Sequence, residues 1–84
     1  MASVILTAVA REELERLPSP IYARVIKVIE RLHDWPNVSG AKPLRGNLAG
    51  RYRIRTGDYR VQFIPAGDTV TIERIGRRDG FYDD

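Results

Sequence analysis

Arginines at alternating positions are the strongest sign of a ligand-binding or reactive surface in this sequence. Arg53 and Arg55 stand two residues apart, and Arg60 follows on the other side of a Gly57-Asp58 pair. Because successive side chains of a strand point to opposite faces, Arg53 and Arg55 would share one face. A guanidinium group is planar, permanently charged and able to bind two oxygens at once, so this pattern indicates recognition of phosphate or carboxylate.

Basic charge is concentrated in the second half of the chain. The 84 residues include 14 Lys and Arg against 11 Asp and Glu, for a net charge of +3, and twelve of the 14 basic residues are Arg. Residues 1–41 carry five basic and five acidic groups, whereas residues 42–78 carry nine basic and three acidic ones, and residues 79–84 carry three acidic ones. A basic region of this kind favours binding to the phosphate backbone of a nucleic acid.

Length and composition limit what else the chain can be. Eighty-four residues, of which 43% are hydrophobic, predict one small domain over residues 1–84. With no Cys and with His33 as the single His, we expect no disulfide, no metal site and no cofactor. The longest apolar stretch, residues 4–10, is far shorter than the ~20 residues that span a bilayer. No Lys or Arg precedes this stretch, as a secretion signal would require, so we expect a cytoplasmic protein without membrane contact.

Two helices are predicted in the first half of the chain, after a short strand at residues 3–7. Thr7 is the expected N-cap of a helix over residues 8–17. Ser19, which precedes a Pro, is the expected capping residue of a second helix that ends at Pro36. The second helix carries an apolar stripe at steps of three and four residues, formed by Ile21, Val25, Val28, Ile29, Leu32 and Trp35.

The second half is predicted to form strands. Residues 36–50 contain two Pro and three Gly without a sustained period, so they are interpreted as a loop. Alternation begins over residues 51–56 and resumes over residues 59–64 after the Gly57-Asp58 turn, and a third strand follows over residues 69–75. The predicted fold is α+β, with an N-terminal strand, an antiparallel two-helix hairpin and a three-stranded antiparallel meander.

The Gly57-Asp58 turn sets the register of the first hairpin and therefore the two faces of the sheet. It places Arg55 opposite Arg60, and a second turn at Ala66-Gly67 would place Arg60 opposite Glu73. The face expected to meet the helices then consists of Tyr52, Ile54, Val61, Phe63, Val70 and Ile72. The other face, called the arginine face below, consists of Arg53, Arg55, Arg60, Gln62, Thr71 and Glu73.

The arginine face has two interpretations. Like charges directly opposite each other in a sheet cost up to about 1 kcal/mol, so a sequence chosen only for folding would avoid them. One interpretation is a solvated sheet face on which Glu73 partly neutralises Arg60. The other is an anion-binding patch, which is favoured by basic residues nearby in sequence, namely Arg45, Arg51, Arg77 and Arg78.

The motifs of the second half resemble those of the RelE/ParE superfamily of bacterial and archaeal toxins. The matching segments are Lys42-Pro43-Leu44-Arg45-Gly46, Gly50-Arg51-Tyr52-Arg53-Ile54-Arg55, Gly57-Asp58-Tyr59-Arg60-Val61-Gln62-Phe63, and Ile75-Gly76-Arg77-Arg78 with Tyr82. The resemblance covers essentially the whole chain. It implies a toxin of a type II toxin–antitoxin system, and hence a cognate antitoxin that lays an acidic, partly helical segment against the arginines.

The RelE-like branch of the family implies a ribosome-dependent endoribonuclease that cuts mRNA in the ribosomal A site and so inhibits translation. In that reaction the RNA's own 2′-OH attacks the adjacent phosphate without a metal ion, and the transition state needs dense positive charge. By this resemblance the catalytic residues are Arg53, Arg55, Arg60, Arg78 and Tyr82. The further expected RNA contacts are Lys42, Arg45, Arg51 and Arg77.

Two departures from the RelE pattern leave the general acid and base unassigned. Arg53 and Arg55 stand where RelE has Lys, and an Arg cannot give up its proton. Arg77 stands where the family usually has His. Tyr82 is the hydroxyl nominated to orient the nucleophile or to stack on a base. Among the other candidates, His33 is interpreted as a surface or boundary residue, Trp35 as a core residue, Tyr52 and Tyr59 as structural, and Glu73 as a partner of Arg60 rather than a base.

Two other functions remain open at this point. Gly76-Arg77-Arg78-Asp79 also resembles the ending of ParE, the branch that poisons DNA gyrase through protein contacts without catalysis. A third function is a small RNA- or ribosome-binding domain without toxicity, which predicts salt-sensitive RNA binding. The RelE-like function is favoured over the ParE-like one because Tyr82 lies six residues after Gly76.

Overall fold

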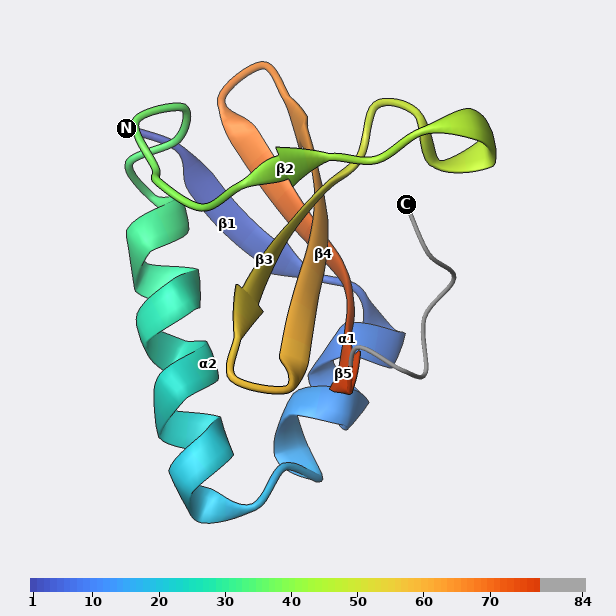
Figure 1. Cartoon of the computed structure of the whole chain (residues 1–84). Coiled ribbons are helices and arrows are strands. Elements are labelled where there is room, and N and C mark those ends of the chain that lie inside the picture. Colours follow the sequence, from blue (N-terminus) through green and yellow to red (C-terminus); the bar gives the residue numbers. More distant parts are fainter. Residues whose placement is uncertain (78–84) are drawn as a thin grey trace.

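The computed structural model describes residues 1–77, which form one mixed sheet with two helices packed on it (Figure 1). The elements in chain order are β1 (Ser3–Leu6), α1 (Ala8–Glu15), α2 (Ser19–Leu32), β2 (Lys42–Pro43), the short 3₁₀ helix η1 (Gly46–Leu48), β3 (Tyr52–Thr56), β4 (Tyr59–Ala66) and β5 (Thr69–Arg77). The strands lie in the order β1-β5-β4-β3-β2, with β1 parallel to β5 and the other pairs antiparallel. The predicted α+β fold is confirmed. None of the helices in residues 1–77 is long and apolar enough to cross a membrane.

The segment between α2 and β3 contains a strand that the sequence pattern does not indicate. A loop is predicted over residues 36–50, but Lys42 pairs with Arg53, and Pro43 pairs with Tyr52, to form β2 at the edge of the sheet. Two residues are too few to show an alternation, and Pro is tolerated in an edge strand, which has a partner on one side only. The sheet therefore gains a fifth strand.

The ends of both helices differ from the prediction. Thr7 is the N-cap of α1, as predicted, and its hydroxyl accepts a hydrogen bond at 3.0 Å from a backbone N–H of the first turn. Ser19 is not a cap, because it is the first residue of α2 and the capping position belongs to Pro18, which makes no side-chain hydrogen bond. α2 ends at Leu32, whereas the apolar stripe predicts an end after Trp35.

Trp35 reaches the core although it lies beyond α2. Its ring centroid is 4.9 Å from that of Tyr52 and 5.2 Å from that of Phe63, both in edge-to-face arrangements. Tyr52 and Phe63 lie opposite each other on β3 and β4. Aromatic pairs of this kind contribute about 0.5–1.5 kcal/mol each beyond their burial. The structural roles predicted for Trp35 and Tyr52 are confirmed.

The first hairpin has the predicted register. β3 and β4 pair with Arg55 opposite Arg60 and with Ile54 opposite Val61. The turn begins at Gly57, whose φ of 61° lies in the left-handed region that favours glycine. The predicted sets of side chains on the two faces of β3 and β4 therefore hold.

The second hairpin has a different register from the predicted one. β4 and β5 close over Gly67-Asp68 instead of Ala66-Gly67. A β-bulge shifts the ladder again further along, so that Arg60 lies opposite Gly76. The predicted backbone pairing of Arg60 with Glu73 is therefore wrong. A bulge adds one residue to one strand of a pair, and alternation read from sequence does not reveal where it occurs.

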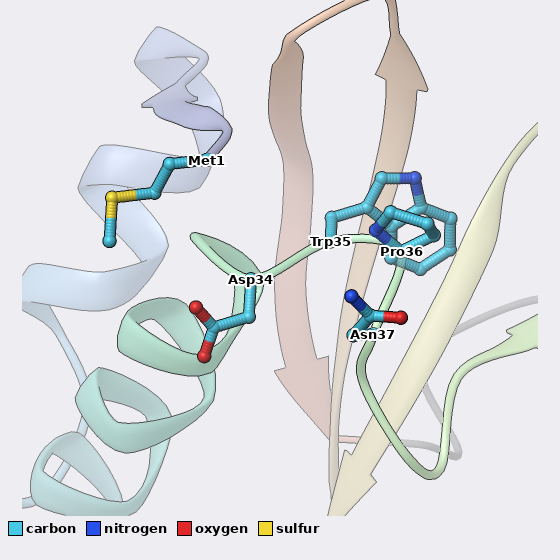
Figure 2. Close-up of a pocket in the computed structure, with 5 residues that line it drawn as sticks. All are labelled: Met1, Asp34, Trp35, Pro36 and Asn37. Carbon is cyan, nitrogen blue, oxygen red and sulfur yellow. The ribbon is translucent and has the colours of Figure 1, made fainter.

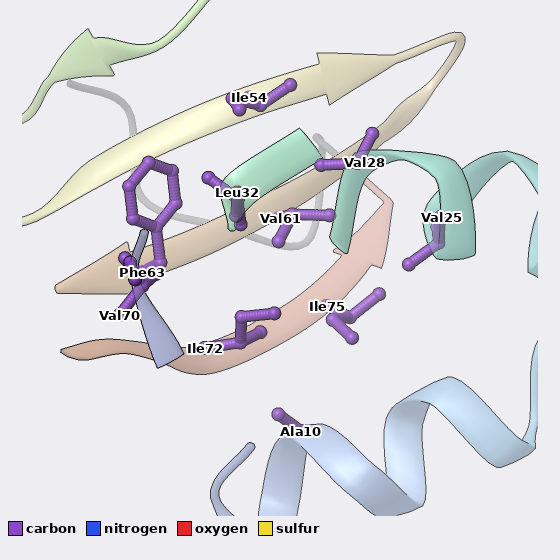
Figure 3. Close-up of a cluster of buried hydrophobic side chains, with 11 residues drawn as sticks. Ala10, Val25, Val28, Leu32, Ile54, Val61, Phe63, Val70, Ile72 and Ile75 are labelled. Atoms are coloured by element: carbon purple, nitrogen blue, oxygen red, sulfur yellow. The ribbon is translucent and has the colours of Figure 1, made fainter. Parts of the chain in front are cut away.

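The core lies between the helices and the sheet face that carries Ile54, Val61 and Phe63 (Figure 3). The buried residues around these three come from α1, α2 and β5, and they are Ala10, Val25, Val28, Leu32, Val70, Ile72 and Ile75. Because the bulge adds a residue to β5, Ile72 and Ile75 both point into the core although they are three residues apart. The predicted core face is confirmed, with Ile75 as an additional member.

α1 covers the part of β5 that β1 does not reach, since β1 pairs only with residues 69–72. Beyond that point, Oε1 of Glu13 accepts the backbone N–H of Ile75 at 2.7 Å. The hydroxyl of Thr7 donates to the backbone carbonyl of Glu73 at 3.1 Å. These two side chains take the place of a neighbouring strand and satisfy the backbone of β5 around the bulge.

Candidate nucleic-acid interface

The arginine face forms on the side of the sheet opposite the helices. Arg53 and Arg55 flank Ile54, which is buried in the core, and Arg60 lies opposite Arg55. Because strand side chains alternate, all three arginines belong to the face away from the helices. The structure thus brings together three of the five predicted catalytic residues.

Two of these three arginines are buried. Arg60 is 1% exposed and Arg53 is 6% exposed, whereas Arg55 is open to solvent. A guanidinium group that leaves water has to be held by hydrogen bonds or by opposite charge, and this restricts its orientation. The interpretation as a solvated face therefore does not describe Arg53 and Arg60, and Arg55 is the accessible cation of the three.

Glu73 is the carboxylate of the arginine face. Its Oε1 lies 2.6 Å from Nε of Arg51 and 3.3 Å from Nε2 of Gln62. The side chains of Glu73 and Arg51 are 23% and 31% exposed, so solvent reaches both. Arg51, a predicted RNA contact, therefore joins the arginine face from the residue just before β3.

A surface hollow of about 360 Å³ lies beside the arginine face and is lined by Lys42, Pro43, Arg45 and Arg53. It is called the basic hollow below. β2 places Lys42 directly opposite Arg53, which sequence reasoning missed because β2 is so short. Three cationic side chains around one hollow are suited to hold a phosphate group of a nucleic-acid backbone. Two predicted RNA contacts, Lys42 and Arg45, are thus adjacent to the arginine face.

Arg77 is set apart from this group. It lies opposite Tyr59 near the end of β5, and its guanidinium carbon is 5.9 Å from the centroid of the Tyr59 ring. Tyr59 continues the row of Val61, which belongs to the helix-covered face. The last two predicted catalytic residues, Arg78 and Tyr82, lie outside the residues that the structure describes.

A larger hollow of about 560 Å³ lies at the turn that follows α2 (Figure 2). Its lining consists of Met1, Asp34, Trp35, Pro36 and Asn37. It contains no predicted site residue, and the carboxylate of Asp34 would repel a phosphate group. His33, just before this turn, is the C-cap of α2 and is half-buried, in agreement with its predicted place at the surface or boundary.

The arrangement is suited to stabilise negative charge on a phosphate. Cationic groups that are already oriented before a reaction stabilise a charged transition state without the cost of reorganising solvent. Arg residues stay protonated in proteins, so these groups stabilise charge but do not transfer protons. The chemistry they can support is the binding and activation of a phosphodiester.

Known proteins share both the sequence and the fold of this chain. The sequence matches the family described as ParE toxin of type II toxin-antitoxin system, parDE, over residues 4–80. It is 42% identical to Toxin RelE of Mycobacterium tuberculosis over 82 residues, which cover 94% of this chain and 84% of that protein. It is 33% identical to Toxin RelG of the same organism over 82 residues, which cover 95% of this chain and 94% of that protein.

A solved structure agrees with these relatives. The toxin–antitoxin complex RelBE2 from Mycobacterium tuberculosis contains a chain with a TM-score of 0.80 and 35% sequence identity, and the match covers 92% of this chain and 91% of that one. The family match extends over most of the sequence, and the relatives at 42% and 33% identity are both toxins of the Rel type. The chain therefore belongs to the RelE/ParE superfamily of type II toxins, within its RelE-like branch.

Proposed function

We propose that this toxin is a ribosome-dependent mRNA endoribonuclease that inhibits translation in the cytoplasm. The observation that carries the proposal is the arginine face, where Arg55 lies opposite Arg60 and Arg53 borders the basic hollow. A sheet face with this many guanidinium groups is costly for folding and suited to an RNA backbone. The similarity to proteins named Toxin RelE and Toxin RelG supports the same function.

In the proposed reaction the 2′-OH of the RNA attacks the adjacent phosphate, and no metal ion takes part. Arg53, Arg55 and Arg60 stabilise the negative charge of the phosphorane-like transition state. The basic hollow and Arg51 hold the RNA backbone so that the 2′-OH is in line with the bond that breaks. The resemblance to the family adds Arg77 as an RNA contact and Arg78 and Tyr82 as catalytic residues.

A cognate antitoxin is the proposed protein partner. The solved relative RelBE2 is a toxin–antitoxin complex, and the arginine face offers the charge that an acidic segment would complement. An acidic, partly helical segment lying on this face would block access of RNA to Arg55. Mixing the toxin with such an antitoxin should therefore abolish RNA binding and cleavage together.

Toeprinting of a translated mRNA with purified, antitoxin-free toxin tests the proposal. We expect new 3′ ends at codons in the ribosomal A site, and none when ribosomes are absent. Arg55→Ala should remove the cleavage, whereas Arg16→Ala, which removes an equal charge from a side chain 81% exposed at the C-cap of α1, should not. Intact mRNA in the presence of folded wild-type toxin would refute the nuclease function.

A ParE-like gyrase inhibitor is the second candidate function. It is favoured by the description of the matching family as a ParE toxin, and by the permanent protonation of Arg53 and Arg55. In that case DNA breaks that depend on gyrase would appear in cells that express the toxin. They would persist in the Arg55→Ala variant, because inhibition would act through protein contacts and not through phosphate chemistry.

A further inference from the structure

The proposed cleavage needs a group that takes the proton from the 2′-OH, and the arginines cannot supply it because they keep their own protons. Within residues 1–77, the arginine face carries one ionisable proton acceptor, the carboxylate of Glu73. We propose that Glu73 is the general base of the reaction, an inference that rests on the proposed function. It assigns Glu73 a role different from that of a partner of Arg60.

Glu73 lies at the β-bulge of β5, on the arginine face where the alternation of the strand also predicts it. The ladder between β4 and β5 skips Glu73, since Gln62 pairs with Arg74 and the register resumes on the other side of the extra residue. Bulges re-aim side chains and occur frequently beside active sites. Here Oε1 of Glu73 lies 3.3 Å from Nε2 of Gln62, in the middle strand of the arginine face.

The position of Glu73 joins a proton acceptor to phosphate-binding groups. Its Oε1 is 2.6 Å from Nε of Arg51, and the carboxylate is 23% exposed, so an RNA hydroxyl can approach it from solvent. On the β1 side, the same face carries Ile5 in the row of Thr71, and neither side chain is charged. The charged side chains that surround Glu73 on the elements packed around it are Arg51, Arg53, Arg60, Arg74 and, from α1, Glu13.

The chemistry balances with Glu73 in this role. The carboxylate takes the proton of the 2′-OH while the 2′-oxygen forms a bond to phosphorus. The bond between phosphorus and the 5′-oxygen breaks, and its electron pair leaves with that oxygen, which takes a proton from water. The products are a 2′,3′-cyclic phosphate and a 5′-OH. Glu73 then gives its proton to the hydroxide that remains, which restores the carboxylate.

The structure offers a matched pair of variants for the test. Glu73→Gln keeps the size of the side chain and an oxygen for Arg51, but it removes the proton acceptor. Glu13→Gln is the control, because Glu13 is a carboxylate 24% exposed that also binds an arginine, Arg74, at 3.1 Å. Glu13 belongs to α1 and not to the arginine face, and circular dichroism confirms folding of both variants before the assay.

The readout is single-turnover cleavage of mRNA on ribosomes that present one codon in the A site. We expect Glu73→Gln to cleave about 10²- to 10⁴-fold more slowly than wild type, with ribosome binding retained. Glu13→Gln should cleave at the wild-type rate.

The possible outcomes distinguish a failure of this inference from a failure of the proposed nuclease function. If folded Glu73→Gln cleaves as fast as wild type, Glu73 is not the base and the nuclease function stands. Faster cleavage by Glu73→Gln would also overturn the inference, because it would show that Glu73 competes with the phosphate for Arg51. Wild-type toxin that leaves the mRNA intact would overturn the proposed function, and the role of Glu73 with it.

Discussion

Arg55 faces Arg60 directly across the ladder between β3 and β4, and Arg60 is 1% exposed whereas Arg55 is open to solvent. Like charges at opposite positions of a sheet repel each other. Because water does not screen the charge of the buried Arg60, an anion that lies against Arg55 would relieve the repulsion. This pair therefore links the cost of the arginine face in folding to its proposed use in binding a phosphate.

Replacing Arg55 tests this link. Arg55→Ala should abolish growth arrest on expression, while the free energy of unfolding stays the same or rises by up to about 1 kcal/mol, because a like-charge contact is removed. Growth after induction and urea unfolding measure the two effects. Arg16→Ala is the control for the loss of one exposed charge. A folded Arg55→Ala toxin that still arrests growth would contradict the assignment of Arg55.

The basic hollow makes a prediction about salt. If Lys42 contacts a phosphate, Lys42→Ala should reduce the slope of log affinity for single-stranded RNA against log salt concentration by about 0.7. Fluorescence anisotropy at several salt concentrations gives this slope. Lys27→Ala, an exposed lysine of α2, should leave it unchanged. Equal slopes for wild type and Lys42→Ala would show that RNA does not enter the hollow.

The contact between α1 and β5 predicts a loss of stability. Glu13→Ala leaves the backbone N–H of Ile75 without its carboxylate acceptor at 2.7 Å, so the free energy of unfolding should fall by about 1–3 kcal/mol. Glu12→Ala should cost about 0–1 kcal/mol, since Glu12 is 66% exposed and its pair with Arg16 spans 3.8 Å. Urea unfolding of both variants measures the difference. Similar small losses would mean that α1 does not hold the edge of β5.

The turns of the two hairpins can be tested by replacing one glycine in each, Gly57 and Gly67. Gly57→Ala should destabilise the protein by about 1–2 kcal/mol, because φ is 61° there. A Cβ at this position would also lie 3.1 Å from Nη1 of Arg24. At Gly67, φ is 57° and no atom lies within 4 Å of the place that an added Cβ would take, so Gly67→Ala introduces the backbone strain without a close contact. Thermal unfolding should therefore show a loss for Gly57→Ala at least as large as for Gly67→Ala, and the reverse order would contradict the contact with Arg24.

The two faces of the sheet were predictable because they depend on local features. The Gly57-Asp58 turn and the alternation around it place Arg55 opposite Arg60, as the structure confirms. In the second hairpin Phe63 lies opposite Ile72 instead of Val70, a shift of two positions. Because side chains alternate with a period of two, this shift leaves each residue before the bulge on its predicted face. The arginine face was therefore predicted correctly although the predicted strand pairing was wrong.

The order of residues along the chain was enough to predict the helices, the hairpin strands and the separation of arginines from aliphatic side chains. These features depend on turn preference and periodicity, which act over a few residues. The folded molecule alone decided three further features. These are the pairing of Lys42 with Arg53, the bulge at Glu73, and the burial of Arg60. Each depends on contacts between segments that are distant in sequence, and a two-residue strand or a single extra residue leaves no periodic pattern from which such contacts could be predicted.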